Sequence, residues 1–210
     1  MSELDYLTPQ ETFWAGEFGS EYIGRNDSQQ LLASNLNFFT KALKQAGQVS
    51  SAIEFGANIG MNLRALQLLY PGAALRGIEI NPDAAEQLRR HIGQDNVYEG
   101  SIFNYSVSDQ VELALIKGVL IHINPDMLPV VYEKLYSASR RFVLVCEYYN
   151  PSPVAIAYRG HADRLFKRDF AGEMMEKYPD LKLVDYGFAY RRDPAFPQDD
   201  ISWFLMEKKS

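Results

Sequence analysis

The sequence predicts an α/β protein with a doubly wound, mostly parallel sheet, an antiparallel terminal hairpin and an N-terminal helical lid, in one domain of 210 residues. Three observations predict this fold. Strand-like apolar runs alternate with amphipathic segments, as in a sheet with helices on both faces. A turn containing Gly56 and Gly60 directly follows the first apolar run. Residues 142–146 are apolar throughout, as expected for a parallel strand buried on both faces.

The first half of the chain predicts three strands and three helices in alternation. A helix begins near Asp27 and stops before Gly47, because apolar residues recur at spacings of three and four. The remaining elements are a strand at 52–55, a helix at 61–70, a strand at 75–80, a helix starting at Asn81-Pro82 and a strand at 96–102. Asn81-Pro82 supplies a cap followed by proline at the first helical position.

The second half predicts four more strands, which makes seven in all. They are residues 111–117, 142–146, 181–190 and 201–207, the last two forming the antiparallel hairpin at one end of the sheet. Asn124-Pro125 starts a helix between the first two, and another helix is expected over residues 167–178. Residues 148–161, with Pro151 and Pro153, are expected to be irregular.

Composition excludes several classes of protein. Lys and Arg number 21 against 27 Asp and Glu, so the net charge of −6 argues against a protein that grips nucleic acid. Cys146 is the only cysteine, and the three histidines are far apart in sequence, so we expect no disulfide and no metal site. The acidic start does not resemble a signal peptide, and no apolar stretch is long enough to span a membrane. We therefore expect a cytoplasmic monomer or weak homodimer.

The strongest motif is Glu54-Phe55-Gly56-Ala57-Asn58-Ile59-Gly60, between a predicted strand and a predicted helix. Gly56 permits a tight turn and a close backbone approach to a ligand, and Gly60 lets the next helix lie against the strand. The spacing is neither that of a dinucleotide fingerprint nor that of a phosphate loop.

An acid at the end of the second strand completes the motif. Glu79 lies 19 positions after Gly60, where a carboxylate can accept both hydroxyls of an adenosine ribose. Because this contact needs a free 2′-hydroxyl, Glu79 disfavours NADP as the ligand. The absence of a pyrophosphate loop disfavours NAD. An adenosine ligand without phosphates remains, S-adenosylmethionine, whose amino group would lie near Glu54.

These residues resemble the class I S-adenosylmethionine-dependent methyltransferases, which have a seven-stranded Rossmann-like sheet. The third motif of that family falls on Gly100-Ser101-Ile102 and the fourth on residues 117–122. The sequence has Asn58 where the family usually has a middle glycine, and Ser101 where it often has an acid. The predicted cofactor-binding residues are Trp14, Tyr22, Arg25, Glu54, Gly56, Asn58, Gly60, Asn62, Glu79, Ile80, Ser101, Ile102 and Lys117.

Segments 13–26, 158–170 and 199–205 resemble a narrower group, the pseudaminic acid biosynthesis-associated methylases. That resemblance spans nearly the whole chain. It implies methyl transfer to a small polar molecule and does not fix the acceptor.

Methyl transfer requires alignment, exclusion of water and management of the acceptor's proton. His122 is the histidine best placed to act as a base, and Glu147 and Tyr22 are further catalytic candidates. Candidate substrate-binding residues are Tyr148, Tyr149, Arg159, His161, Arg164 and Lys167. The alternative is that His122 is an ordinary loop histidine. In the same way, the basic residues Arg159, His161, Arg164 and Lys167 could belong to a solvated helix start.

Three parts of the single domain are expected: a helical lid or cap at 1–46, a cofactor-binding core at 47–150, and an acceptor-side segment with the terminal strands at 151–210. Trp14, Phe18 and Tyr22 would share one helical face, although glycines weaken a long helix there. The alternative is a helix docked on the sheet edge without covering the site.

The predicted function is methyl transfer from S-adenosylmethionine to a nitrogen or oxygen of a small polar metabolite. An amino or carboxylate sugar, such as a nonulosonic-acid pathway compound, or an amino-acid-like acceptor would suit the mixed charges. The alternatives are a non-catalytic S-adenosylmethionine-binding module or partner subunit on the same fold, and a nucleotide-sugar reductase.

Overall fold

The computed structural model describes residues 6–24, 28–158 and 161–209. Its main sheet has seven strands in the order β3-β2-β1-β4-β5-β9-β8. In chain order these strands are β1 Ser51–Phe55, β2 Ala74–Glu79, β3 Val97–Glu99, β4 Val111–Lys117, β5 Ser139–Glu147, β8 Leu181–Ala189 and β9 Ile201–Lys208. β1 to β5 run parallel, whereas β9 pairs antiparallel with both β5 and β8. The predicted mostly parallel sheet with a terminal antiparallel pair is confirmed.

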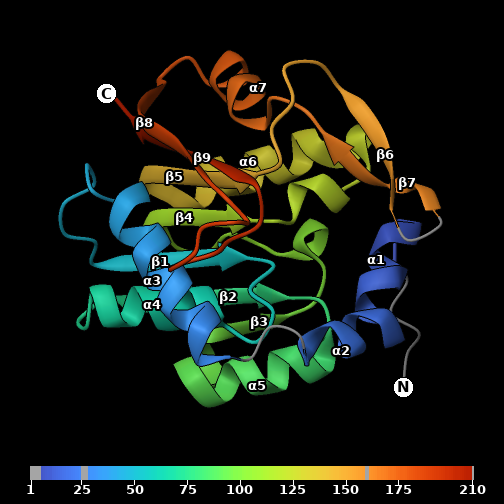
Figure 1. Cartoon of the computed structure of the whole chain (residues 1–210), viewed down its shortest axis with the longest axis horizontal. Helices are drawn as coiled ribbons and strands as arrows, with labels where there is room; N and C mark the ends of the chain where they lie inside the picture. The colour runs from blue at the N-terminus through green and yellow to red at the C-terminus, as the bar shows by residue number, and fades with distance from the viewer. Residues whose placement is uncertain (1–5, 25–27, 159–160, 210) are drawn as a thin grey trace.

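Helices cover both faces of this sheet (Figure 1). On one face lie α3 Gln29–Ala42, α4 Met61–Leu69 and α5 Pro82–Ile92; on the other lie α6 Leu128–Ala138 and α7 Phe170–Lys177. Short 3-10 turns are η1 Gln94–Asn96, η2 Ile102–Asn104, η3 Leu120–His122 and η4 Pro125–Met127. Among the described residues, no helix has the length and apolar character needed to cross a membrane.

The central strand β4 shows why the sheet is buried on both sides. Leu113 and Leu115 pack with α3 and α4, and Ala114 and Ile116 pack with α6 and α7. All four are completely buried. Alternate residues of an apolar strand therefore supply both halves of the core, as the sequence pattern predicts.

Two expectations about the second half of the chain are wrong. Residues 148–161 are not irregular throughout, because β6 Val154–Tyr158 pairs antiparallel with β7 His161–Lys167 in a separate two-stranded sheet. The helix expected from residue 167 begins at Phe170, because Asp169 caps it by accepting a hydrogen bond from the Gly172 N–H at 2.8 Å. β6 escapes a pattern-based prediction because its first three residues, 154–156, are all exposed.

The third strand is also shorter than the predicted 96–102. β3 ends at Glu99, and Gly100 has a φ of 151°. Ser101 then starts η2, its hydroxyl accepting a hydrogen bond from the Phe103 N–H at 3.0 Å. Residues 100–102 therefore form a turn at the sheet edge.

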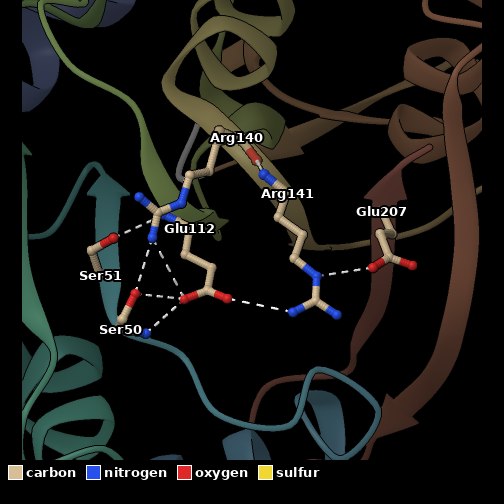
Figure 2. Close-up of polar contacts among 7 residues, drawn as sticks. Ser50, Ser51, Glu112, Arg140, Arg141 and Glu207 are labelled. Atoms are coloured by element: carbon tan, nitrogen blue, oxygen red, sulfur yellow. Dashed lines mark hydrogen bonds and ion pairs between the residues drawn. The ribbon is translucent and has the colours of Figure 1, made fainter. Parts of the chain in front are cut away.

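A polar network ties together the strand ends on the side of the sheet away from this turn (Figure 2). Glu112 of β4 accepts hydrogen bonds from the N–H and hydroxyl of Ser50 at 2.8 and 2.7 Å. The guanidinium group of Arg141, on β5, forms two ion pairs. Its Nη1 lies 3.5 Å from Glu112 Oε1, and its Nε lies 3.0 Å from Glu207 Oε1 on β9. The Ser50 hydrogen bonds, with the nearby arginines, hold the pKa of Glu112 below its usual range. β1, β4, β5 and β9 are thus fixed relative to one another at this end.

The carboxyl ends of the parallel strands lie at the opposite end. Two short helices, α1 Pro9–Ala15 and α2 Glu17–Ile23, and the β6–β7 hairpin lie on that side of the molecule (Figure 1). Gly16 ends α1 and begins α2, so the chain bends where the sequence predicts that glycine weakens a long helix. In open α/β sheets this end is where ligands bind.

Candidate functional site

A cavity of about 710 Å³ opens at the carboxyl ends of β1, β2 and β4. Its wall includes twelve of the predicted site residues: Trp14, Tyr22, Gly56, Asn58, Asn62, Glu79, Ile80, Ser101, Ile102, Lys117, His122 and Tyr148. A cavity of this size suits a nucleoside-containing ligand together with a small second molecule.

The loop after β1 has the left-handed backbone that its glycines allow. Gly56 has a φ of +76° and Gly60 a φ of +85°. Asn58, in place of the family's middle glycine, has a φ of 49°, which asparagine tolerates better than most residues. A Cβ on Gly60 would lie 2.6 Å from Leu88 of α5. Gly60 therefore permits close packing of this loop against α5.

Glu54 lies beneath the loop and is completely buried. Its Oε1 accepts a hydrogen bond from the Asn62 side-chain amide at 2.6 Å. Neither Glu54 Oε2 nor Asn62 Oδ1 has a hydrogen-bond partner among the described residues. Burial raises the pKa of Glu54 to about 8, although Asn62 and the charge of Lys117 lower it. Two hydrogen-bonded neighbours thus each have a buried oxygen without a partner among the described residues, and an ionised Glu54 here suits a cationic ligand.

Glu79 ends β2, the strand next to β1, and is buried at the cavity wall. Its Oε2 accepts a hydrogen bond from the Asn58 N–H at 2.7 Å, and its Oε1 accepts one from the Asn81 N–H at 2.8 Å. Burial raises the pKa of Glu79 against these hydrogen bonds, which lower it. The carboxylate is thus fixed by backbone on both sides, with the Ile80 N–H as a third backbone group that lowers its pKa.

Asn81 connects this carboxylate to the two N-terminal helices. Its side-chain oxygen caps α5 by accepting hydrogen bonds from the N–H groups of Asp83 and Ala84, both at 3.1 Å. Its side-chain amide lies 3.3 to 3.4 Å from the carbonyl oxygens of residues 14–16 and 3.2 Å from the Ser20 hydroxyl. One side chain therefore holds the end of α1 and the start of α5 together.

We expect Asn81→Asp to loosen α1 and α2 while leaving α5 in place. Aspartate keeps the capping oxygen and is an equally good helix cap, but it loses the amide that donates to residues 14–16. Hydrogen exchange in α1 and α2 should accelerate about fivefold to tenfold, as expected for the loss of roughly 1 kcal/mol of hydrogen bonding. Unchanged exchange there, with α5 also unchanged, would show that Asn81 does not hold α1 and α2 against α5.

Aromatic side chains of α1 and α2 form a cluster at the cavity. Trp14 lies 5.3 Å from Phe18 and 5.4 Å from Tyr22, between ring centroids. The predicted shared face therefore exists, although two helices rather than one carry it. Trp14 also lies 4.7 Å from the His122 ring, so α1 contacts the turn after β4.

Glu147, at the end of β5, fixes the turn after β4. Its Oε1 accepts hydrogen bonds from the N–H groups of Val119 and Leu120 at 2.9 and 2.8 Å. Its Oε2 has no hydrogen-bond partner among the described residues, and burial raises its pKa to about 7. The carboxylate is not part of the cavity wall. The geometry supports a positioning role for Glu147 toward residues 119–122 and places His122 nearer the ligand space.

On the acceptor side, the structure brings together some predicted residues and separates others. Tyr148 lines the cavity and forms a hydrogen bond with Asp199. The pKa of Tyr148 is raised mainly by burial and further by the Asp199 carboxylate. The Lys167 ammonium lies 5.1 Å from the centre of the Tyr148 ring. Tyr149 instead is 42% exposed and lies against Phe204, outside the cavity wall.

Four predicted residues cannot be placed by their side chains. Arg25 and Arg159 lie outside the described residues. The backbone of His161 and Arg164 belongs to β7, but their side chains are not described. Their proposed roles remain predictions.

The structure adds cavity residues that sequence reasoning missed: Glu11, Asn35, Arg191, Gln198 and Asp199. Gln198 donates a hydrogen bond to Asn35 Oδ1 at 2.7 Å, which ties the β8–β9 connection to α3. No local pattern marks this pair, which is 163 positions apart. Glu11 does have a local signal, because Thr8-Pro9-Gln10-Glu11 has the spacing of a capping box.

Comparisons with known proteins identify the fold. No family model matches the chain, and no curated protein matches it. The chain is similar to the mitomycin 7-O-methyltransferase MmcR, with a TM-score of 0.68 and 15% identity, covering 96% of this chain and 61% of that one. It thus spans less than two thirds of that protein's length.

Two further neighbours are matched over most of their own length. The magnesium protoporphyrin IX methyltransferase ChlM from Synechocystis PCC 6803, with bound SAM, has a TM-score of 0.69 and 11% identity, covering 96% of this chain and 98% of that one. The Burkholderia thailandensis 1,6-didemethyltoxoflavin-N1-methyltransferase, with bound S-adenosylhomocysteine, has a TM-score of 0.70 and 14% identity. The match covers 95% of this chain and 87% of that one.

The protein therefore has the Rossmann-like fold of S-adenosylmethionine-dependent methyltransferases. The narrower resemblance to the pseudaminic acid biosynthesis-associated methylases is not confirmed by these comparisons and stays a prediction.

Proposed function

We propose that the protein is an S-adenosylmethionine-dependent methyltransferase that acts on a nitrogen or oxygen of a small polar metabolite. The observation that carries the proposal is a pair of buried oxygens, Glu54 Oε2 on β1 and Asn62 Oδ1 on α4, which have no hydrogen-bond partner in the described part of the chain. Asn62 lines the cavity. A buried carboxyl with a raised pKa gains most from a cationic partner. The ammonium group of S-adenosylmethionine is such a partner.

The other contacts fit the same ligand. Glu79 ends the strand next to Glu54, and its two oxygens can accept the two hydroxyls of a ribose. Gly56 lines the cavity directly after β1, where its left-handed backbone turns the chain toward Val119. Ile80 and Ile102 offer apolar walls for a base beyond the ribose.

The cofactor supplies the reactive methyl group. The chain aligns it, excludes water and handles the proton of the acceptor. Trp14 and Tyr22 close the cavity from α1 and α2, and aromatic rings there both exclude water and stabilise a positive charge. His122, beside Trp14, is the base that we propose for an acceptor that must lose a proton.

A mixed polar wall supports a small polar acceptor. Tyr148 with Asp199 and Asn35 with Gln198 form two hydrogen-bonded pairs that line the cavity. Such pairs offer both donors and acceptors to hydroxyl, amino or carboxylate groups. An amino or carboxylate sugar, or an amino-acid-like molecule, fits this chemistry.

Ligand binding is expected to release a proton from Glu54. Its pKa is raised from 4.5 to about 8, so between these values the empty protein keeps Glu54 protonated. An ammonium group favours the ionised form and expels the proton. The binding enthalpy of S-adenosylhomocysteine at pH 7 should therefore vary with the ionisation enthalpy of the buffer. Its affinity should rise with pH and level off above pH of about 8.

Two controls assign the proton. Glu54→Gln should bind more weakly and release no proton, whereas a proton still released by that variant would come from elsewhere, for instance Glu147. A desamino analogue of S-adenosylhomocysteine should release none from the unaltered protein. Equal release with both ligands would contradict the assignment of Glu54 to the ammonium group.

Turnover separates the enzyme from a silent binding module on the same fold. The protein is incubated with S-adenosylmethionine and a library of small polar metabolites, and formation of S-adenosylhomocysteine is measured. An acceptor whose turnover falls in His122→Asn, with unchanged cofactor affinity, supports the proposal. Tight binding without turnover of any acceptor would support the non-catalytic alternative.

A further inference from the structure

Glu11 of α1 reaches the far end of the cavity and contacts the turn after β3. Its Oε2 accepts hydrogen bonds from the N–H and hydroxyl of Thr8 at 2.8 and 3.1 Å. Its Oε1 accepts a hydrogen bond from the hydroxyl of Ser101, 90 positions away in sequence. Glu11 is only 6% exposed and belongs to the cavity wall.

The carboxylate retains capacity for one more donor. Its two oxygens offer about four lone-pair positions. Thr8 uses two of them on Oε2, and Ser101 uses one on Oε1. The Ser101 hydroxyl is itself fixed, because it accepts a hydrogen bond from the Phe103 N–H at 3.0 Å. The remaining position of Oε1 is an acceptor at the cavity wall that a donor of a bound ligand can use.

The order of the strands places this acceptor relative to the proposed ligand. Glu54 lies on β1 and Glu79 at the end of β2, and Ser101 follows β3, the next strand in the sheet. If the ammonium group binds at Glu54 and the ribose at Glu79, the base extends toward Ser101. Ile80, Ile102 and Phe103 line the cavity on this side and provide apolar contacts for a flat ring.

We propose that Glu11 selects adenine as the base of the ligand, by accepting a hydrogen bond from the exocyclic amino group on Oε1 while Oε2 caps α1. This inference rests on the proposed function. Adenine presents an amino donor at that position, whereas hypoxanthine presents a carbonyl oxygen, which a carboxylate repels. Because Glu11 belongs to α1, recognition of the base also involves the N-terminal helix.

The test compares two ligands that differ only in the base. They are S-adenosylhomocysteine and S-inosylhomocysteine, in which hypoxanthine replaces adenine. The unaltered protein should prefer the adenine ligand by about tenfold to a hundredfold, the range expected for a hydrogen bond to a charged group. In Glu11→Gln the preference should fall at least fivefold, because the amide can donate to the hypoxanthine oxygen.

Matched variants separate base selection from support of the helix. Thr8→Ala removes the cap and keeps the carboxylate, so both affinities should fall in the same proportion. Ser101→Ala leaves the capping box intact but removes the hydroxyl that holds Glu11 Oε1 in place, so it should also reduce the preference. Thermal unfolding confirms that each variant is folded.

The outcomes distinguish the two proposals. If Glu11→Gln and Ser101→Ala weaken both ligands equally and keep the preference, Glu11 only supports α1 and the inference is overturned. If the unaltered protein binds neither ligand, the proposed function itself fails. Strong binding of both ligands with no preference overturns the assignment of Glu11 and leaves the proposed function intact.

Discussion

Gly56→Val is expected to abolish binding of S-adenosylmethionine and to destabilise the protein by about 2–5 kcal/mol. A left-handed backbone costs a residue with a side chain about 1–2 kcal/mol, and forced overpacking costs about 1–3 kcal/mol. Gly56 has a φ of +76°, and a Cβ there would lie 2.5 Å from Val119 Cγ2. The sequence alone suggested that this side chain would occupy ligand space; the structure shows that it first meets Val119.

Gly47→Val is the matched control. Gly47 has a φ of +69°, but nothing lies within 4 Å of a Cβ built there. This variant should therefore lose only the backbone contribution and keep full ligand affinity. Thermal unfolding and titration with S-adenosylhomocysteine measure both effects. Equal stability losses in the two variants, with binding retained by Gly56→Val, would contradict the close contact with Val119.

Replacing Glu79 has the second largest expected effect. Each hydrogen bond to a charged group contributes about 1.5–3 kcal/mol, so losing the carboxylate should weaken ligand binding at least tenfold. Glu79→Ala would also leave the Asn58 and Asn81 N–H groups without their acceptor. Glu79→Ala should therefore also destabilise the fold. Glu79→Gln keeps the size and one acceptor and is the better variant.

A ligand lacking the 2′-hydroxyl makes this test specific. The unaltered protein should bind 2′-deoxy-S-adenosylhomocysteine more weakly than S-adenosylhomocysteine, and Glu79→Gln should bind both with similar affinity. Glu99→Gln is the control, because Glu99 pairs with Glu79 in the β2–β3 register but is held by Arg89 outside the cavity. A folded Glu79→Gln variant that still discriminates between the two ligands would refute the ribose assignment.

The parts of the site that could be predicted from sequence are those built from local geometry. Gly56, Asn58 and Gly60 follow one strand, and Glu79 ends the next, so chain order and strand pairing together bring them to one edge. Buried parallel strands are similarly visible, because every residue of 142–146 is apolar and buried.

What could not be predicted depends on contacts between distant segments or on exposed elements. Ser101 departs from the family pattern, and the sequence does not show that Glu11 lies against it. Asn81 could be predicted as a helix cap, but not as the partner of residues 14–16. In the β6–β7 hairpin, residues 154–156 of the first strand are all exposed, so no alternation of buried and exposed residues marks it.

The position of β9 has a consequence for synthesis on the ribosome. β9 is made after β8 yet lies between β5 and β8 in the sheet. Until Ile201–Lys208 has emerged, β8 has no partner in the sheet, and β5 presents an unpaired edge beside the apolar side chains of Phe142 and Leu144. Unpaired apolar edges recruit other chains. Ile201 also lines the cavity, so the nascent chain completes its ligand site in the same late step that protects it from aggregation.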